Sequence, residues 1–263
     1  MSNNKKQIYQ AAYKNIFANI FREIRLFITL LAAISGFVVK HATIPRIIAI
    51  LFSLAFSMYL VNYQPHNYRL AIGYFLLSEA LYIGFITLVL SENGLRNWFI
   101  KRWGDEQKGY LAYEAALGII FFHNGASIGY IISSTAGNIP HYGVLSAILA
   151  VVFIFGFTVK LWSARVVSID IYYWKDMFLG KKICGFVETG PYKYFKNPMY
   201  GVGQLQAYAL ALWYGSALGL IAVTLNQILV FAFYYLVENK FIERVYKNKT
   251  PQTLECLVVD SEQ

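Results

Sequence analysis

Long apolar stretches alternate with short polar ones along most of the chain. The longer stretches approach the roughly 20 apolar residues that a helix needs to cross a membrane. Pro45 suits the first turn of one of these helices, and Gly215 separates the last two stretches as a hinge. The pattern predicts membrane helices at residues 26–39, 45–63, 70–90, 111–135, 142–162, 201–214 and 216–237.

Two segments depart from this pattern. Residues 164–198 are polar, basic and aromatic, and three glycines, at positions 180, 185 and 190, interrupt any long helix there. Residues 238–263 are polar; they keep a helical period at first and lose it after Pro251. Neither segment has the composition of a membrane span or of a separate soluble domain.

The composition supports the membrane interpretation. Of the 263 residues, 57% are hydrophobic and only 14% are charged, whereas soluble domains are about a quarter charged. The 20 Phe, 21 Tyr and 5 Trp fit a protein whose aromatic rings sit at membrane interfaces. We therefore expect an all-α fold, a polytopic membrane helix bundle of about six or seven membrane segments.

Basic residues gather in segments between the apolar runs. Four Lys or Arg lie in residues 92–110, seven in 160–200 and four in 238–263, whereas 136–142 holds none. The positive-inside rule places those three segments on the cytoplasmic side if two spans separate each from the next. Five bases near the N-terminus conflict with this orientation unless one early run, best the short run 26–39, does not cross.

The net charge of +9 could also suggest nucleic acid. Its distribution over short loops between apolar runs instead indicates the lipid bilayer as partner, and no nucleic acid is expected.

Candidate functional residues are densest in 188–203, Glu-Thr-Gly-Pro-Tyr-Lys-Tyr-Phe-Lys-Asn-Pro-Met-Tyr-Gly-Val-Gly. Asn197 and Pro198 are residue types preferred at the N-cap and first position of a helix, so a helix is predicted to begin there. A helix N-terminus beside a basic, aromatic loop suits a carboxylate or phosphate, although the pattern alone favours a capped membrane helix with aromatic residues at the membrane interface. The residues predicted to share one helix face are Asn197, Tyr200, Gly201 and Gln204.

Two motifs in the C-terminal half resemble a known superfamily. Residues 190–201, Gly-Pro-Tyr-Lys-Tyr-Phe-Lys-Asn-Pro-Met-Tyr-Gly, resemble the signature of the integral-membrane methyltransferases, which include phosphatidylethanolamine N-methyltransferases and isoprenylcysteine carboxyl methyltransferases. Residues 236–246, Leu-Val-Glu-Asn-Lys-Phe-Ile-Glu-Arg-Val-Tyr, resemble the acidic motif that follows the last span in that superfamily. By layout the resemblance extends over residues 111–249, and Asn-Pro-Met-Tyr favours the phospholipid branch.

The resemblance implies transfer of a methyl group from S-adenosylmethionine to a membrane lipid, best an aminophospholipid headgroup, at a cytoplasmic-side site near the C-terminus. It makes Glu238 and Tyr200 the catalytic candidates, because Glu238 matches the first acid of the family's Glu-Glu pair. The chain departs from the family at Asn239, in place of the second acid, and at Lys196, in place of an Arg. The residues implied to contact the cofactor are Gly190, Tyr192, Tyr194, Asn197, Pro198, Tyr200, Gly201, Gly203, Glu238 and Asn239.

The resemblance also divides the chain into accessory membrane segments, residues 1–110, and a methyltransferase-like core with its C-terminal motif, residues 111–263. Glu79 lies mid-run outside that core, and we expect it to hydrogen-bond between helices or to contact a partner. His123 and Asn124 are expected to join helices by hydrogen bonds.

The sequence offers no spaced ligand set for a metal, so no metal is expected. Glu243 and Lys247 stand four positions apart, which predicts a helical ion pair. Glu238 has Ile242 at the corresponding position, which leaves its carboxylate available for a cation or an amine.

Three other functions stay open from the sequence. The first is a prenylcysteine carboxyl methyltransferase, and the second is an NADPH-dependent membrane reductase of the steroid- or sterol-reductase type. The third is a non-catalytic scaffold of the same fold. Asn239, which replaces an acid of the family's motif, would then be a sign of lost activity. The sequence does not indicate the oligomeric state.

Overall fold

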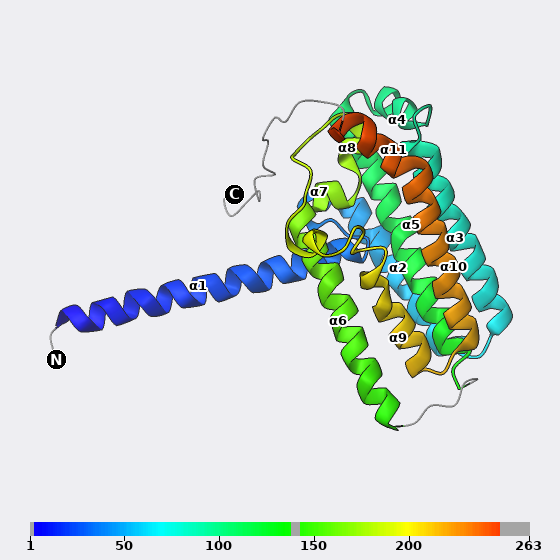
Figure 1. The fold of residues 1–263 in the computed structure, drawn as a ribbon, viewed down its shortest axis with the longest axis horizontal. Helices are drawn as coiled ribbons and strands as arrows, with labels where there is room; N and C mark the ends of the chain where they lie inside the picture. Colours follow the sequence, from blue (N-terminus) through cyan, green and yellow to red (C-terminus); the bar gives the residue numbers. More distant parts are fainter. Residues whose placement is uncertain (1–2, 138–142, 248–263) are drawn as a thin grey trace.

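The computed structural model describes the backbone of residues 3–137 and 143–247, and the side chains of residues 18–137 and 145–247. The described chain is helical and contains no strand. Figure 1 shows the long helices packed side by side, apart from α1. The helices are α1 (Asn3–Ile34), α2 (Ile44–Tyr63), α3 (Tyr68–Leu90), α4 (Arg96–Trp103), α5 (Glu106–Ser134), α6 (Gly143–Val167), α7 (Ile169–Tyr172), α8 (Lys175–Leu179), α9 (Leu205–Trp213), α10 (Ala217–Phe233) and α11 (Asn239–Ile242).

Shorter turns of 3-10 helix complete the chain: η1 (Val39–His41), η2 (Gly190–Lys193) and η3 (Val202–Gln204). Two widened, π-helical turns, Tyr234–Glu238 and Glu243–Lys247, flank α11.

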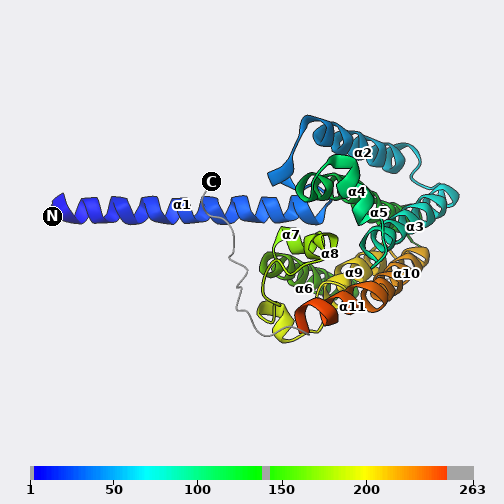
Figure 2. The same ribbon diagram turned by 90° about the horizontal axis from the view of Figure 1, so that it is seen from above.

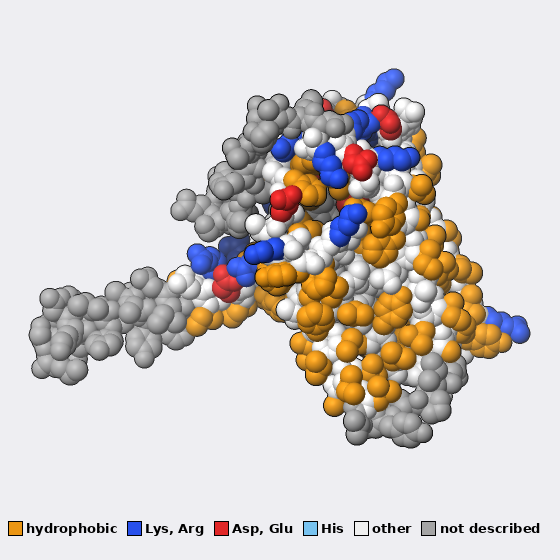
Figure 3. All heavy atoms as spheres, in the orientation of Figure 1, with side chains coloured by type: hydrophobic (Ala, Val, Ile, Leu, Met, Phe, Trp, Pro, Cys, Tyr) orange, Lys and Arg blue, Asp and Glu red, His pale blue; other side chains and the backbone are white. Residues whose placement is uncertain are grey.

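Five helices of the described chain are long and apolar enough to cross a membrane: α2, α3, α5, α6 and the continuous helix over Ala217–Lys247. Figure 3 shows hydrophobic side chains spread over the lower part of the bundle, with most of the charged ones near its upper end and near α1. The chain is therefore a polytopic membrane protein of the all-α class, as predicted. The count of six or seven membrane segments stays a prediction, since α9 has only 9 residues.

From residue 45 onward the predicted runs correspond closely to the observed helices. Polar caps at the N-termini help to fix where several of these helices begin. Asn67 accepts a hydrogen bond from the Leu70 amide at the start of α3, and Asp105 accepts one from the Lys108 amide at the start of α5. Ser216 caps α10 in the same way. The predicted start of one run at residue 142 lies outside the described residues, as does the tail after residue 251.

Helix α1 does not run along the bundle. Figures 1 and 2 show it extending sideways, across the direction of α3, α5 and α10. The predicted run 26–39 is thus divided between the end of α1 and a turn. That this run does not cross the membrane stays a prediction.

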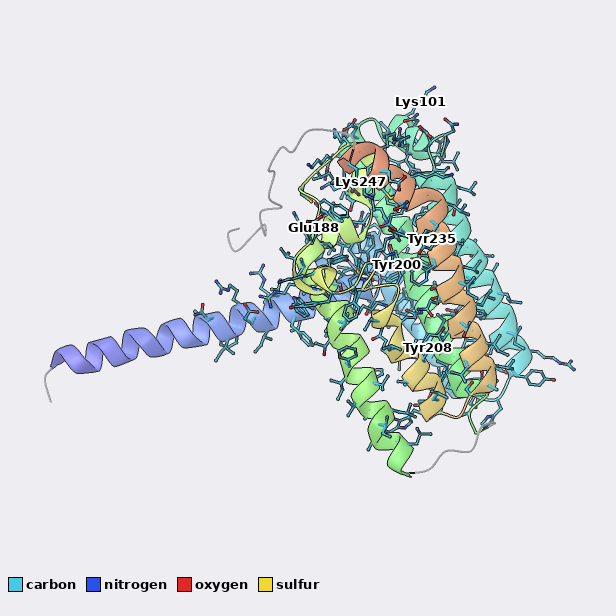
Figure 4. The ribbon with its side chains drawn as sticks, viewed as in Figure 1. Lys101, Glu188, Tyr200, Tyr208, Tyr235 and Lys247 are labelled. Carbon is cyan, nitrogen blue, oxygen red and sulfur yellow. The ribbon has the colours of Figure 1, made fainter. Side chains whose placement is uncertain are left out.

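The three basic segments meet at one end of the bundle. Lys181 donates to Glu106 at 2.6 Å, and Tyr246 donates to Asp176 at 2.8 Å. Arg244 also forms an ion pair with Glu92. Figure 4 shows Lys101 and Lys247 at this same end. The distribution of loop charges along the sequence therefore predicted correctly that these segments lie together.

A buried ion-pair cluster attaches η1 and α2 to α5. The Glu114 side chain is fully buried, and its Oε2 lies 2.7 Å from His41 Nδ1 and 3.0 Å from Arg46 Nη1. Arg46 also donates to the Leu111 carbonyl. Because charges are costly to bury unless they are paired, this cluster fixes the position of α2 on the bundle.

Helices of the two predicted domains share one core. Phe99 of α4, Tyr110 and Tyr113 of α5 and Phe178 of α8 form a buried aromatic cluster in which Tyr113 and Phe178 stack with centroids 5.0 Å apart. The division at residues 110 and 111 stays a prediction.

Candidate active site

The motif segment folds as a turn and not as the predicted helix start. The Gly201 amide donates to the Asn197 carbonyl at 2.9 Å, and the Gly203 amide donates to the Pro198 carbonyl at 2.7 Å. Regular α-helix begins only with α9, at Leu205. Gly201 has φ −91° and ψ −96°, which lie outside the helical region, so the helix predicted from Asn197 and Pro198 cannot continue through it.

Two glycines bring the motif against α6. A Cβ on Gly203 would lie 3.2 Å from the Cβ of Lys160, and a Cβ on Gly156 would lie 2.7 Å from the Gln206 amide nitrogen. Gly203 is therefore required for close packing of the motif turn on α6. Gly190 has φ +60° and lies against Trp162, which holds η2 at the end of the same helix.

The two predicted catalytic residues are joined directly. Tyr200 Oη donates to Glu238 Oε2 at 2.9 Å, and the Trp174 side chain also hydrogen-bonds to the Glu238 carboxylate. Gln227 of α10 donates to the Tyr200 carbonyl at 2.9 Å and so holds the turn in place. Figure 4 shows Tyr200 between the motif turn and the C-terminal helix.

Glu243, the other acid of the C-terminal motif, is exposed and lies elsewhere. Its Oε1 accepts a hydrogen bond from Asn239 Nδ2 at 2.9 Å, so the partner is Asn239 and not the predicted Lys247. The widened turns on either side of α11 change the angular spacing of Glu243 and Lys247 from that of a regular α-helix, which the predicted ion pair requires. Asn239 also accepts from Tyr234 at 3.3 Å.

A cavity of about 450 Å³ lies beside the motif turn, between α5, α6, α9 and α10. Tyr200 is the predicted site residue that lines it. Tyr82, Phe121, Tyr172, Tyr173 and Trp174 form much of the wall at the same end. These aromatic residues come from three separate elements and share no local motif, so the sequence gives no signal that they lie together.

The other predicted cofactor residues lie around this wall or away from it. Tyr192 is close enough to Glu238 for the carboxylate to affect its pKa. Tyr194 is 69% exposed, with Lys193 above its ring. Pro198 is buried in the turn, beside the half-buried Asn197. The structure thus brings Tyr192, Tyr200 and Glu238 together and leaves Tyr194 outside.

Burial decides the protonation of the site tyrosines. Burial raises the pKa of Tyr200 well above its ordinary value, and the adjacent Glu238 carboxylate raises it further. The same two causes, in the same order, raise the pKa of Tyr192. Burial also raises the pKa of Asp176, against the opposing effect of its hydrogen bond from Tyr246. Tyr200 therefore stays a hydrogen-bond donor at neutral pH.

A polar network crosses the bundle next to the cavity. Glu79 Oε2 accepts from Asn124 Nδ2 at 2.7 Å and from Asn226 Nδ2 at 2.9 Å. Asn226 in turn accepts from Gln204 Nε2 at 2.9 Å. The network therefore links α3, α5 and α10 to the motif segment, and it confirms the expectation that Glu79 and Asn124 join helices.

His123 also joins helices, as expected. Its ring nitrogens lie 2.6 Å from Tyr74 Oη and 3.0 Å from Ser53 Oγ, so it connects α5 to α3 and α2.

Replacing Glu79 by Leu is expected to destabilise the fold by about 1–3 kcal/mol for each amide left without an acceptor. Glu79→Gln is the matched control, since it keeps an oxygen for Asn124 and Asn226. The free energy of unfolding can be measured by SDS titration in mixed micelles. Equal stability of Glu79→Leu and the parent would contradict a structural role for this network.

In a comparison with known protein families, residues 145–249 match the phospholipid methyltransferase family. A phosphatidylethanolamine N-methyltransferase from Eremothecium gossypii is 32% identical over 97 residues, which are 37% of this chain and 12% of that protein. One from Talaromyces marneffei is 35% identical over 106 residues, 39% of this chain and 10% of that protein. One from Malassezia globosa is 28% identical over 156 residues, 55% of this chain and 15% of that protein.

The matches cover only a small part of the length of these curated relatives, and no solved structure matches the chain. Both motifs identified in the sequence, 190–201 and 236–246, lie inside the matched residues 145–249. The resemblance to the membrane methyltransferases is therefore confirmed for the part of the chain that carries the cavity's α6, motif turn, α9 and α10.

Proposed function

We propose, from the match of residues 145–249 to the phospholipid methyltransferase family, that this protein transfers a methyl group from S-adenosylmethionine to the amine of a membrane aminophospholipid. The observation that carries the proposal is the Tyr200–Glu238 hydrogen bond at the aromatic end of the cavity. It joins the two motifs of the resemblance at one place. We further infer that this end of the bundle, where the basic segments meet, is the cytoplasmic one.

The residues present fit a sulfonium cofactor and an amine substrate. The cavity of about 450 Å³ is within the usual range for a bound small molecule. The aromatic rings of Tyr172, Trp174 and Tyr200 can attract a cation, and Tyr200 is hydrogen-bonded to the carboxylate of Glu238. S-adenosylmethionine supplies an already activated methyl group, so the protein has mainly to align the reacting atoms.

The chain's own residues can remove the proton that keeps a lipid amine unreactive. Tyr200 Oη can accept a proton from the ammonium group while it passes its own proton to Glu238 Oε2, across the hydrogen bond of 2.9 Å. The amine lone pair is then free to attack the methyl carbon. After transfer, the cationic product stays in contact with aromatic faces. Gly190, Tyr192, Asn197, Pro198, Gly201, Gly203 and Asn239 are proposed to shape the cofactor's surroundings, whereas the exposed Tyr194 is the weakest of the predicted contacts.

Incubation of the purified protein with methyl-labelled S-adenosylmethionine and phosphatidylethanolamine vesicles tests this function. We expect labelled mono- and dimethylated lipid by mass spectrometry. We also expect S-adenosylhomocysteine, and not NADPH, to raise the melting temperature in detergent, since a ligand bound only by the folded state stabilises it. Stabilisation by NADPH alone would favour a reductase, and the absence of both ligand effects and of labelled lipid would favour a non-catalytic scaffold.

A further inference from the structure

The cavity is amphipathic along its length. Its lining on α5 runs from Leu117 to Ile132, about four turns of helix or roughly 22 Å at 1.5 Å per residue. The end near Tyr200 is aromatic and polar, whereas the opposite end is lined by Ile132, Phe153 and Leu210. A ligand that fills this cavity therefore needs a polar group joined to a long apolar one.

Two glycines leave room at the apolar side. Gly125 and Gly129 both line the cavity on α5, and a Cβ added to either would meet no atom within 4 Å. The glycine at each position is thus not explained by helix packing. The free space extends along one face of α5, as a lipid chain would require.

Lys160 stands where the lining changes from apolar to polar. It follows Phe153 and Phe157 on the same face of α6, and all three line the cavity. Its stem is fixed because its Cβ packs where Gly203 of the motif turn approaches α6. Lys160 takes part in none of the ion pairs or hydrogen bonds that the described residues form with one another.

A lysine ammonium group inside a membrane span needs a counter-charge, and here the cavity is where one can lie. Two anions come into question, the carboxylate of the methyl donor and the phosphate of the lipid acceptor. In an aminophospholipid the phosphate stands between the amine and the acyl chains. In the cavity Lys160 stands between the aromatic end with Tyr200 and the apolar end with Phe153, in the same order.

We propose that Lys160 binds the phosphate of the phospholipid acceptor and that the groove along Gly125 and Gly129 holds one of its acyl chains. This inference rests on the proposed function for the identity of the lipid. The cavity thereby selects a diacyl phosphodiester with an amine headgroup. An amine without the phosphate, or a soluble phosphoethanolamine without the chains, fills only part of it.

Lipid binding without methyl transfer tests this assignment separately from the proposed function. Native mass spectrometry counts phosphatidylethanolamine bound to the parent protein and to Lys160→Met, which keeps the length of the side chain without its charge. We expect Lys160→Met to bind this lipid about tenfold to a hundredfold more weakly, the effect of losing one charge-assisted contact. Lys160→Arg should bind within a few-fold of the parent, and diacylglycerol should bind the parent and Lys160→Met equally.

Two further measurements separate the sources of the anion. Calorimetric titration with S-adenosylhomocysteine should give the same Kd for the parent and for Lys160→Met. Gly129→Leu fills the groove, so it should weaken both phosphatidylethanolamine and diacylglycerol. The proposal would be overturned if Lys160→Met bound phosphatidylethanolamine as tightly as the parent does. It would also be overturned if the variant lost affinity for S-adenosylhomocysteine and not for the lipid. Both results would count even if methyl transfer is demonstrated. Lipid binding that depends on Lys160 would support it even if no methyl transfer is found.

Discussion

Glu238→Gln is expected to lower the kcat of methyl transfer about 100-fold or more, the usual range for loss of a proton acceptor. Glutamine can still accept the hydrogen bond from Tyr200, so the site keeps its shape. It cannot take up the proton that Tyr200 passes on when the lipid amine is deprotonated. The assay is transfer of labelled methyl groups from S-adenosylmethionine to phosphatidylethanolamine, with size-exclusion chromatography as a check on folding.

Glu243→Gln is the matched control, since it makes the same chemical change five residues further along. Glu243 is exposed, and its observed partner is Asn239 and not a residue that lines the cavity. The variant should therefore keep most of the activity. Similar loss in both variants, or loss in Glu243→Gln alone, would mean that the C-terminal motif acts through a different acid.

Glu114→Gln is expected to lower the free energy of unfolding by about 3–5 kcal/mol, the usual cost of breaking a buried ion pair from one side. The substitution leaves Arg46, whose side chain is 17% exposed, without its carboxylate partner. The loss should appear as a shift in SDS-induced unfolding in mixed micelles, followed by tryptophan fluorescence.

Glu106→Gln provides the comparison for that measurement. Glu106 pairs with Lys181 at 2.6 Å, but both side chains are more than half exposed. An exposed pair contributes about 0–1 kcal/mol, because water and salt screen it. Equal effects of the two variants would show that the cluster of Glu114, His41 and Arg46 does not hold α2 to the bundle.

Much of the bundle was predictable from hydrophobic pattern alone. Runs 45–63 and 70–90 became α2 and α3 within two residues at each end, and Gly215, with φ +62°, separates α9 from α10 as predicted. In a membrane the backbone N–H and C=O groups find no water to bond, and a helix pairs them all within one segment. A long apolar run in a membrane protein is therefore strongly expected to form a helix. The loop charges predicted that the basic segments meet at one end, because basic residues of membrane proteins collect in the loops on one side of the membrane.

Local rules failed where contacts between segments compete with them. Asn197 and Pro198 have the residue types of a helix start, yet the chain forms a turn there because Gly203 packs against α6 beside Lys160. The predicted pair of Glu243 and Lys247 assumed regular helical spacing, which the widened turns around α11 alter.

The sequence by itself determined the membrane class, the helix positions and the two motifs, because each depends on residues close together in the chain. Only the tertiary structure decided that Tyr200 donates to Glu238, 38 positions away, and that Lys160 lines the same cavity. It also decided that Glu79 belongs to a network with Asn124 and Asn226. Such contacts depend on how the helices pack in three dimensions. The spacing of apolar residues in the sequence indicates which face of a helix is buried, but it does not determine which neighbouring helix that face contacts.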